Sequence, residues 1–164
     1  MSTFPTKILL ASDSSDTAAH AMDLAVELCE QTGSQLHLVY VGEDAYPATF
    51  ISPEAANLEG VPPREDPVLI EQLQRQSDQM ARRVLDTEVQ KVREAGGTVA
   101  QAHLRMGKAD IEIVELAKEI DAGLLILGSR GSGMIKRALI GSVSNSVVRH
   151  AHCPVTVVRQ DKDE

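Results

Sequence analysis

The stretch from Gly123 to Ser146 combines glycines and hydroxyls in an order typical of an anion-binding turn. An apolar run, Leu124 to Leu127, stops at Gly128, Gly131 follows, and Gly141-Ser142 opens a segment of helical character. Backbone N–H groups at a helix N-terminus hold anions because they lack intrahelical partners and the dipole is positive there. Glycine lets the backbone approach a phosphate without a Cβ clash. The stretch therefore predicts a phosphate-binding loop.

The charge is unevenly distributed along the chain. The window from Ala122 to Gln160 contains no Asp or Glu, although the chain has 24 of them, and its five basic residues are Arg130, Lys136, Arg137, Arg149 and Arg159. Because the whole chain has a net charge of −8 and this window +5, the remainder is at −13. An anionic ligand is expected to be drawn to this window. The overall negative charge argues against general nucleic-acid binding.

Three better-known chemistries do not fit the spacing. A Walker loop needs Lys-Ser or Lys-Thr after its second glycine, but Met134 and Ile135 follow Gly133. A dinucleotide fingerprint needs a third glycine where Lys136 stands. No Gly-x-Ser-x-Gly elbow supports a hydrolytic serine, and no second ligand cluster accompanies the His150-Ala-His152-Cys153 run, so no protein metal site is expected.

The glycine spacing, Gly128-x-x-Gly131, then nine residues, then Gly141-Ser142, resembles the nucleotide-binding signature of the universal stress protein family, in its ATP-binding branch. Other motifs extend the resemblance over nearly the whole chain. They are Lys7-Ile-Leu-Leu-Ala-Ser-Asp13, Met106-Gly107 before a helix, Ala122-Gly-Leu-Leu-Ile-Leu-Gly128 and His152-Cys-Pro-Val-Thr-Val-Val158. Ser14 is a departure, because the family's first turn reads Asp-Gly-Ser.

The resemblance implies a site for ATP with Mg²⁺. Asp13 would contact ribose hydroxyls or, through a metal, phosphate, and Val41 would meet the adenine through its backbone. Arg130 and Lys136 are candidate phosphate partners. The full set of expected nucleotide-binding residues is Ala11, Asp13, Val41, Leu127, Gly128, Arg130, Gly131, Gly141, Ser142, Val143 and Ser144.

Hydrophobic periodicity predicts that strands and helices alternate. Expected strands are 7–11, 36–41, 98–106, 124–127 and 154–158, and expected helices are 16–32, 67–94, 108–120 and 142–150. Such alternation indicates an α/β fold: an open five-stranded parallel sheet with helices on both faces. The resemblance supplies the strand order 3-2-1-4-5 and an adenine nucleotide alpha hydrolase-like architecture. Residues 1–164 are expected to form a single domain, with a long proline-rich surface loop at 42–67 and a polar tail at 160–164.

The same patterns assign local detail. Asp16 is predicted to cap the first helix, whose inner face is expected to run from Ala18 to Cys29. The second helix is expected to bury a stripe that includes Met80, and the third to bury Ile111.

Function is expected to be regulatory. The final strand, 155–158, lies at a sheet edge, and edge strands of this kind invite pairing with a second copy. Family members dimerise through that strand, so a homodimer with further, unknown protein partners is expected. Because no clear base or phosphoryl-transfer lysine is present, binding is favoured over robust catalysis. A slow ATP hydrolase and a nucleotide-free dimeric interaction module stay open as alternatives. No signal region or membrane span is evident, which favours a cytoplasmic protein.

Overall fold

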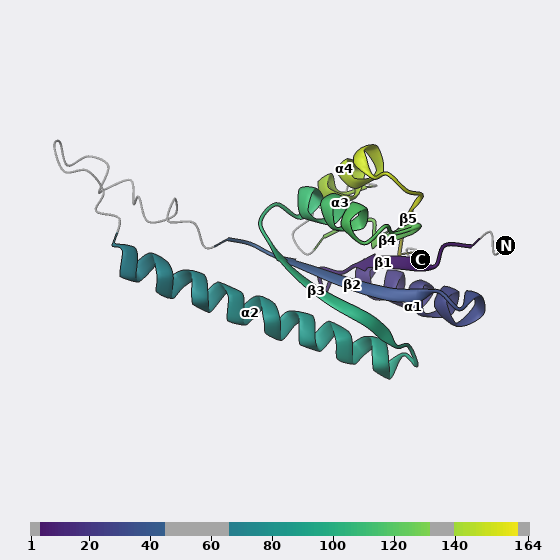
Figure 1. Ribbon diagram of the computed structural model, residues 1–164, viewed down its shortest axis with the longest axis horizontal. Helices are drawn as coiled ribbons and strands as arrows, with labels where there is room; N and C mark the ends of the chain where they lie inside the picture. Colours follow the sequence, from purple (N-terminus) through teal and green to yellow (C-terminus); the bar gives the residue numbers. More distant parts are fainter. Residues whose placement is uncertain (1–3, 45–65, 132–139, 161–164) are drawn as a thin grey trace.

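The computed structural model describes residues 4–44, 66–131 and 140–160, which form a parallel sheet between two layers of helices (Figure 1). The sheet has five strands in the order β3-β2-β1-β4-β5, all neighbours being parallel. The predicted fold class and strand order are therefore confirmed. The elements in chain order are β1 (Lys7–Ala11), α1 (Asp16–Thr32), β2 (Gln35–Gly42), α2 (Pro67–Glu94), β3 (Val99–Met106), α3 (Ala109–Glu119), β4 (Leu124–Gly128), α4 (Ser142–His150) and β5 (Val155–Val158).

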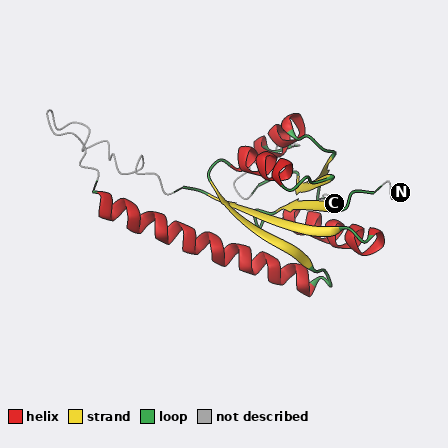
Figure 2. Cartoon of the chain, in the orientation of Figure 1, coloured by secondary structure: helices red, strands yellow, loops and turns green. Residues whose placement is uncertain are grey.

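Each face of the sheet has its own aliphatic core. Ile8, Leu10 and Leu38 point toward α1 and α2, whereas Leu9 and Val39 point toward α3 and α4. Because successive side chains of a strand alternate between faces, a strand that is covered on both sides must be apolar throughout, as β1 is. Figure 2 shows the strands enclosed between the two helical layers.

The N-cap of the first helix lies one residue before the predicted cap. Ser15 is the N-cap, and its hydroxyl accepts a hydrogen bond from the Ala18 N–H, while Asp16 is the first helical residue. Ser15 has the extended backbone that an N-cap needs, and Asp16 instead favours the positive end of the helix dipole. The predicted end at Gly33 is confirmed, with a left-handed φ of 71°.

Two predicted inward residues are exposed. Met80 is 67% exposed and Ile111 is 48% exposed. With 28 residues, α2 is about 42 Å long, whereas an eight-residue strand such as β3 spans about 26 Å. The N-terminal half of α2 therefore extends past the sheet, as Figure 1 shows. In α3 the buried residues are Ile113, Val114, Leu116 and Ala117, so its inner face is turned away from Ile111.

The predicted 42–67 loop lies mostly outside the described residues. Of its two ends, Gly42 closes β2 and Pro67 is the first residue of α2, after the N-cap Asp66. The tail at 161–164 also lies outside the described part. No helix among the described residues is long and apolar enough to cross a membrane.

Candidate functional site

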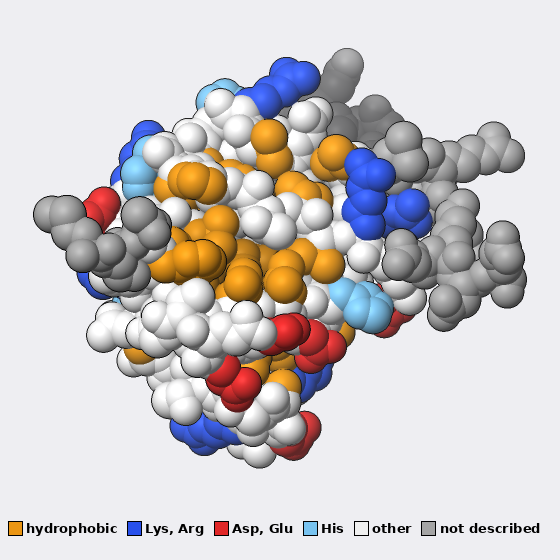
Figure 3. Space-filling model, turned by 90° about the vertical axis from the view of Figure 1, so that its right-hand side faces the viewer, with side chains coloured by type: hydrophobic (Ala, Val, Ile, Leu, Met, Phe, Trp, Pro, Cys, Tyr) orange, Lys and Arg blue, Asp and Glu red, His pale blue; other side chains and the backbone are white. Residues whose placement is uncertain are grey.

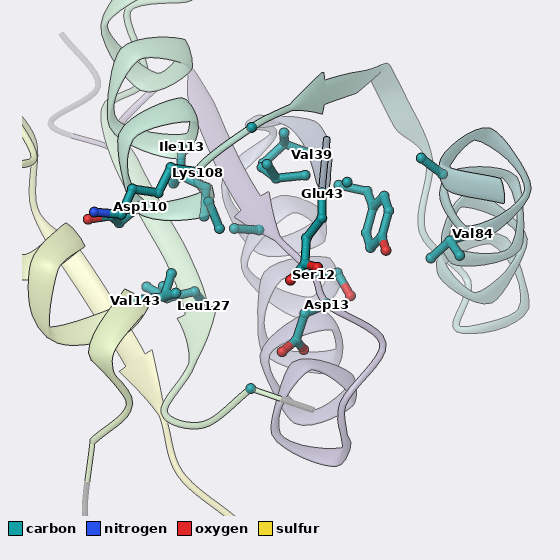
Figure 4. Close-up of a pocket in the computed structure, with 18 of the residues that line it drawn as sticks. Ser12, Asp13, Val39, Glu43, Val84, Lys108, Asp110, Ile113, Leu127 and Val143 are labelled. Carbon is teal, nitrogen blue, oxygen red and sulfur yellow. The ribbon is translucent and has the colours of Figure 1, made fainter. Parts of the chain in front are cut away.

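A cavity of about 990 Å³ lies at the carboxyl edge of the sheet, where the chain leaves β1, β2 and β4. In a parallel α/β sheet this edge is where ligands bind, at the point where strand order reverses. All the predicted nucleotide-binding residues line this one cavity, from Ala11 and Asp13 to Val143 and Ser144. Figure 4 shows Asp13 between Leu127 and Val143 on one side and Val84 of α2 on the other. Their contact with a nucleotide stays a prediction.

The loop after β4 is held by the start of α1. Thr17 donates its hydroxyl to the Arg130 carbonyl at 2.7 Å, and Ser15 donates to the same oxygen at 3.2 Å. Gly128 is needed for this approach, because a Cβ there would lie 2.5 Å from the Thr17 hydroxyl and 2.8 Å from its backbone. Further along, the Gly141 N–H donates to the Ser129 carbonyl at 2.6 Å. The described residues on either side of 132–139 therefore lie side by side.

The N-terminus of α4 faces the cavity with no side-chain cap. Gly141 is the N-cap residue, and no side chain among the described residues accepts from the first turn. Helical geometry leaves the N–H groups of Ser142, Val143 and Ser144 without intrahelical acceptors, so they can bind an anion. The Ser144 hydroxyl is occupied: it is buried and donates to the Gly128 carbonyl at 2.8 Å. Ser144 thus offers its backbone to a ligand.

The backbone of Val41 is directed at the cavity by the sheet register. The last paired residues of β1 and β2 are Ala11 and Val39, and the Ser12 N–H donates to the Val39 carbonyl at 3.1 Å. Polar backbone groups alternate sides along a strand, so Val41 directs its N–H and C=O the same way as Val39. By Val41, however, β1 has ended. On the β1 side, the N–H and C=O of Val41 therefore face the cavity, because no described strand residue lies opposite them there.

Asp13 lies on a tight turn after β1. Its Oδ1 accepts from the Ser15 N–H at 3.0 Å, and its Oδ2 is the atom that a Cβ on Gly131 would meet at 2.9 Å. Ser14 has a φ of 66°, in the left-handed region that favours glycine. The turn therefore accommodates a Cβ at the position where the sequence departs from the Asp-Gly-Ser pattern.

Glu88 of α2 is part of the site's architecture, and sequence reasoning missed it. Its carboxylate is 2% exposed and accepts from Ser12 (2.6 Å), Ser14 (3.0 Å) and Lys91 (2.6 Å). Burial alone would raise the pKa of Glu88, but the hydrogen bonds from Lys91 and the two serines outweigh it and leave the pKa below its usual value. A lone acidic residue on the inner face of a predicted helix was the only signal available.

The start of α3 forms another wall that the sequence did not identify. Lys108, Asp110 and Ile113 line the cavity and lie on the side of Asp13 opposite Val84 in Figure 4. Ser146 of α4 donates to Asp110 at 2.7 Å, and this hydrogen bond lowers the pKa of the Asp110 carboxyl. The position of Gly107 at a strand end could have pointed to this wall, because the carboxyl ends of β2 and β3 share one edge.

The described lining is more acidic than the local sequence charge predicts. Of the basic residues in the 122–160 window, Arg130 lines the cavity, Arg149 and Arg159 are exposed elsewhere, and Lys136 and Arg137 lie outside the described residues. The charged residues that do line it are Asp13, Glu43, Asp44, Asp110, Lys108 and Arg130. A polyphosphate in this cavity would need a counter-cation.

Comparison with known proteins identifies one family throughout. The family model for the universal stress protein family matches residues 5–159. A universal stress protein of Methanocaldococcus jannaschii is 30% identical over 158 residues, covering 96% of this chain and 84% of that protein. Another, from Bacillus subtilis, is 31% identical over 153 residues, covering 93% and 98%.

Solved structures share the fold. The universal stress protein UspA from Lactobacillus plantarum superposes with a TM-score of 0.72 at 27% identity, covering 94% of this chain and 97% of that one. A universal stress protein in complex with cAMP has a TM-score of 0.59 at 23% identity, covering 96% and 99%. One from Archaeoglobus fulgidus in complex with dAMP has a TM-score of 0.55 at 20% identity, covering 94% and 98%.

Proposed function

The chain belongs to the universal stress protein family, and we propose that it binds an adenine nucleotide, ATP with Mg²⁺, in the cavity at the carboxyl edge of its sheet. Nucleotide occupancy would then control which partners a regulatory homodimer engages under stress. The proposal covers binding without robust catalysis.

The observation that carries this proposal is the uncapped N-terminus of α4 beside the Gly128–Gly131 loop. Helix N-termini left without a side-chain cap are anion sites, because their N–H groups and the dipole point at the same place. A Cβ added at Gly141 would lie 3.9 Å from the Gly131 nitrogen. The loop and the start of α4 therefore lie close together and form one cradle. A phosphate is the ligand group that suits it.

The opposite part of the cavity suits a nucleoside. Val39, Ile113 and Leu127 supply apolar walls for a purine ring, and the outward N–H and C=O of Val41 match the donor–acceptor edge of adenine. Asp13 lies between the two parts, where a ribose hydroxyl or a phosphate-bound cation would be. The acidic lining favours the magnesium complex of ATP over the free anion.

The two relatives in complex with cAMP and dAMP support an adenine nucleotide as the ligand class. Both of those ligands contain a single phosphate, whereas the cavity of about 990 Å³ has room for a nucleoside triphosphate. ATP is therefore the form we propose for this chain.

The test combines released-nucleotide mass spectrometry with calorimetric titration of ATP·Mg²⁺, AMP and cAMP. Wild type is compared with Gly131→Val, which crowds the cradle: among the described residues, Asp13 Oδ2 is the atom that an added Cβ meets within 4 Å. Ala100→Val, on an exposed residue near the start of β3, is the control. We expect micromolar ATP binding by wild type and control and a loss of at least tenfold, about 1.4 kcal/mol, in Gly131→Val. No binding by wild type would refute the proposal.

Hydrolysis is measured on the same samples. We expect ATP to remain intact over many binding lifetimes. Steady turnover that Gly131→Val abolishes would replace regulatory binding with the slow-hydrolase alternative. If wild type neither carries nor binds a nucleotide, the alternative of a nucleotide-free dimeric interaction module would be favoured.

We propose that the homodimer forms through β5. This strand is at the edge of the sheet, and its four residues are all partly exposed. Figure 3 shows hydrophobic side chains gathered on one face of the molecule. The Pro154 carbonyl accepts from Leu125 of β4 and the Val158 carbonyl from Ser129, directly after β4. The alternate residues Val155 and Val157 therefore direct their backbone groups outward. Val157→Pro removes an outward N–H and spares the pairing with β4, whereas Val157→Thr keeps it. Light scattering should give a dimer mass for wild type and Val157→Thr and a monomer mass for Val157→Pro; a monomeric wild type would refute the dimer.

A further inference from the structure

Ser14 holds a backbone conformation that needs support. Its φ of 66° places a residue with a Cβ in the left-handed region. That conformation is unfavourable for residues other than glycine and persists only when surrounding contacts hold it. Ser14 is exposed, so core packing does not supply those contacts.

Besides a local bond from the Ser14 N–H to Ser12 Oγ at 3.3 Å, the support comes from α2, far away in the sequence. Ser14 donates its hydroxyl to Glu88 Oε1 at 3.0 Å, and Ser12 donates to Glu88 Oε2 at 2.6 Å. The two carboxylate oxygens thus hold the residues on either side of Asp13. Lys91 donates to Oε1 at 2.6 Å and balances the charge, which a carboxylate 2% exposed requires.

The consequence is the direction of Asp13. With its neighbours fixed to α2 and its own Oδ1 bonded to the Ser15 N–H, the Asp13 side chain directs Oδ2 toward Gly131. Figure 4 shows the Asp13 carboxylate pointing away from Val39, toward the loop after β4. Glu88 does not itself line the cavity, so it acts on a ligand only through this turn.

We propose that Glu88 is the positioning residue of the nucleotide site: it clamps Ser12 and Ser14, holds Ser14 in the left-handed conformation and thereby fixes the Asp13 carboxylate for ribose or for phosphate-bound metal. This inference rests on the proposed function for its ligand. It adds α2 to the elements on which nucleotide affinity depends.

The test is a rescue experiment on ATP·Mg²⁺ affinity. Glu88→Gln replaces one acceptor oxygen by a donor, and we expect affinity to fall roughly tenfold. Adding Ser14→Gly to that variant should restore affinity to within about threefold of wild type, because glycine adopts the left-handed conformation without an anchor. Asp86→Asn, an exposed acid on the same helix, is the control and should bind as wild type does. Equal affinity of Glu88→Gln and wild type would overturn the inference, and so would a loss that Ser14→Gly does not restore.

A second variant covers the case in which Glu88→Gln does not fold. Ser14→Ala removes one clamp at an exposed position and leaves the carboxylate with Ser12 and Lys91. We expect it to lower affinity by about threefold with little change in the unfolding midpoint. Unchanged affinity in this variant also counts against the clamp.

Amide exchange of the nucleotide-free protein separates this inference from the proposed function. The Ser15 N–H is protected by Asp13 Oδ1, so its exchange rate reports the order of the turn. We expect roughly tenfold faster exchange in Glu88→Gln and near-wild-type exchange after Ser14→Gly is added. If wild type binds no nucleotide, the proposed function fails and this rate alone decides the inference: faster exchange supports the clamp, and an unchanged rate overturns it.

Discussion

Gly128→Ala tests whether the first glycine of the loop serves packing, because its neighbours belong to α1. A Cβ at this position would lie 2.5 Å from Thr17 Oγ1, 2.8 Å from the Thr17 carbonyl carbon and 2.9 Å from the Ala18 nitrogen. Two of these atoms are backbone, so no side-chain rotation can relieve the contact. The helix must withdraw from β4, and the Thr17 bond to the Arg130 carbonyl lengthens with it.

The expected cost follows from three contributions. Overpacking against fixed backbone costs about 1–3 kcal/mol, and weakening one buried hydrogen bond adds about 1 kcal/mol. The lower chain entropy of unfolded alanine offsets up to about 1 kcal/mol. The net loss of unfolding free energy is therefore about 1–4 kcal/mol, which lowers Tm by roughly 2–16 °C in a domain of this size.

Urea denaturation followed by circular dichroism measures this loss, with Gly131→Ala as the matched control. Among the described residues, an added Cβ at Gly131 meets one side-chain oxygen, Asp13 Oδ2, and no backbone atom, so its stability should stay within about 0.5 kcal/mol of wild type. The two glycines of one motif should thus differ in their effects: Gly128 should affect the stability of the fold, and Gly131 the binding of the ligand. A Gly128→Ala protein as stable as wild type would refute the packing argument.

Three further outcomes are expected. His37 and His103 stack with 3.0 Å between Nδ1 and Nε2, and burial chiefly lowers the pKa of both below 6.5. The unfolded chain then binds protons that the folded chain does not, so stability is full above pH 6.5 and falls below it, by up to about 1.4 kcal/mol per histidine at pH 5.5. Urea titrations above pH 6.5 and at pH 5.5 check this, and His103→Gln should reduce the difference in unfolding free energy between them. Ser144→Ala loses the hydroxyl bond to the Gly128 carbonyl and should cost about 1 kcal/mol of stability while leaving ATP affinity within about twofold, as calorimetry would show. Burial raises the pKa of the Cys29 thiol to about 11, so alkylation by iodoacetamide at pH 8 should be at least about a hundredfold slower than that of a small free thiol; rapid labelling would contradict the burial.

Local patterns were sufficient for the elements and for most of the candidate site. The apolar run at Leu124 ending in Gly128, and the cap Asp66 before Pro67, each act over a few residues, and the structure places strand and helix there. All the residues expected at the nucleotide site line one cavity because consecutive strands of a parallel sheet end at the same edge. Strand direction places these ends at one edge, and the strand order, which the family resemblance supplied, makes β2, β1 and β4 neighbours there.

It was harder to predict which helix residues face the sheet, because this depends on where each helix lies on the sheet. Apolar spacing makes Met80 and Ile111 plausible inward residues, yet both are exposed. For Met80 the reason is the length of α2, and for Ile111 it is the rotation of α3 about its axis. Neither the overhang of α2 nor the rotation of α3 can be predicted from a short window of sequence.

The sequence by itself thus determined the alternation of strands and helices and the spacing of the glycine loop, because these depend on local backbone preferences. Only the tertiary structure decided that α1 seats the loop through Thr17, that α3 forms a wall of the cavity, and that Glu88 holds the turn around Asp13. Contacts between residues 74 or more positions apart arise when packing brings whole elements together. A buried carboxylate such as Glu88 can be recognised as part of the candidate site's architecture only once its partners are known.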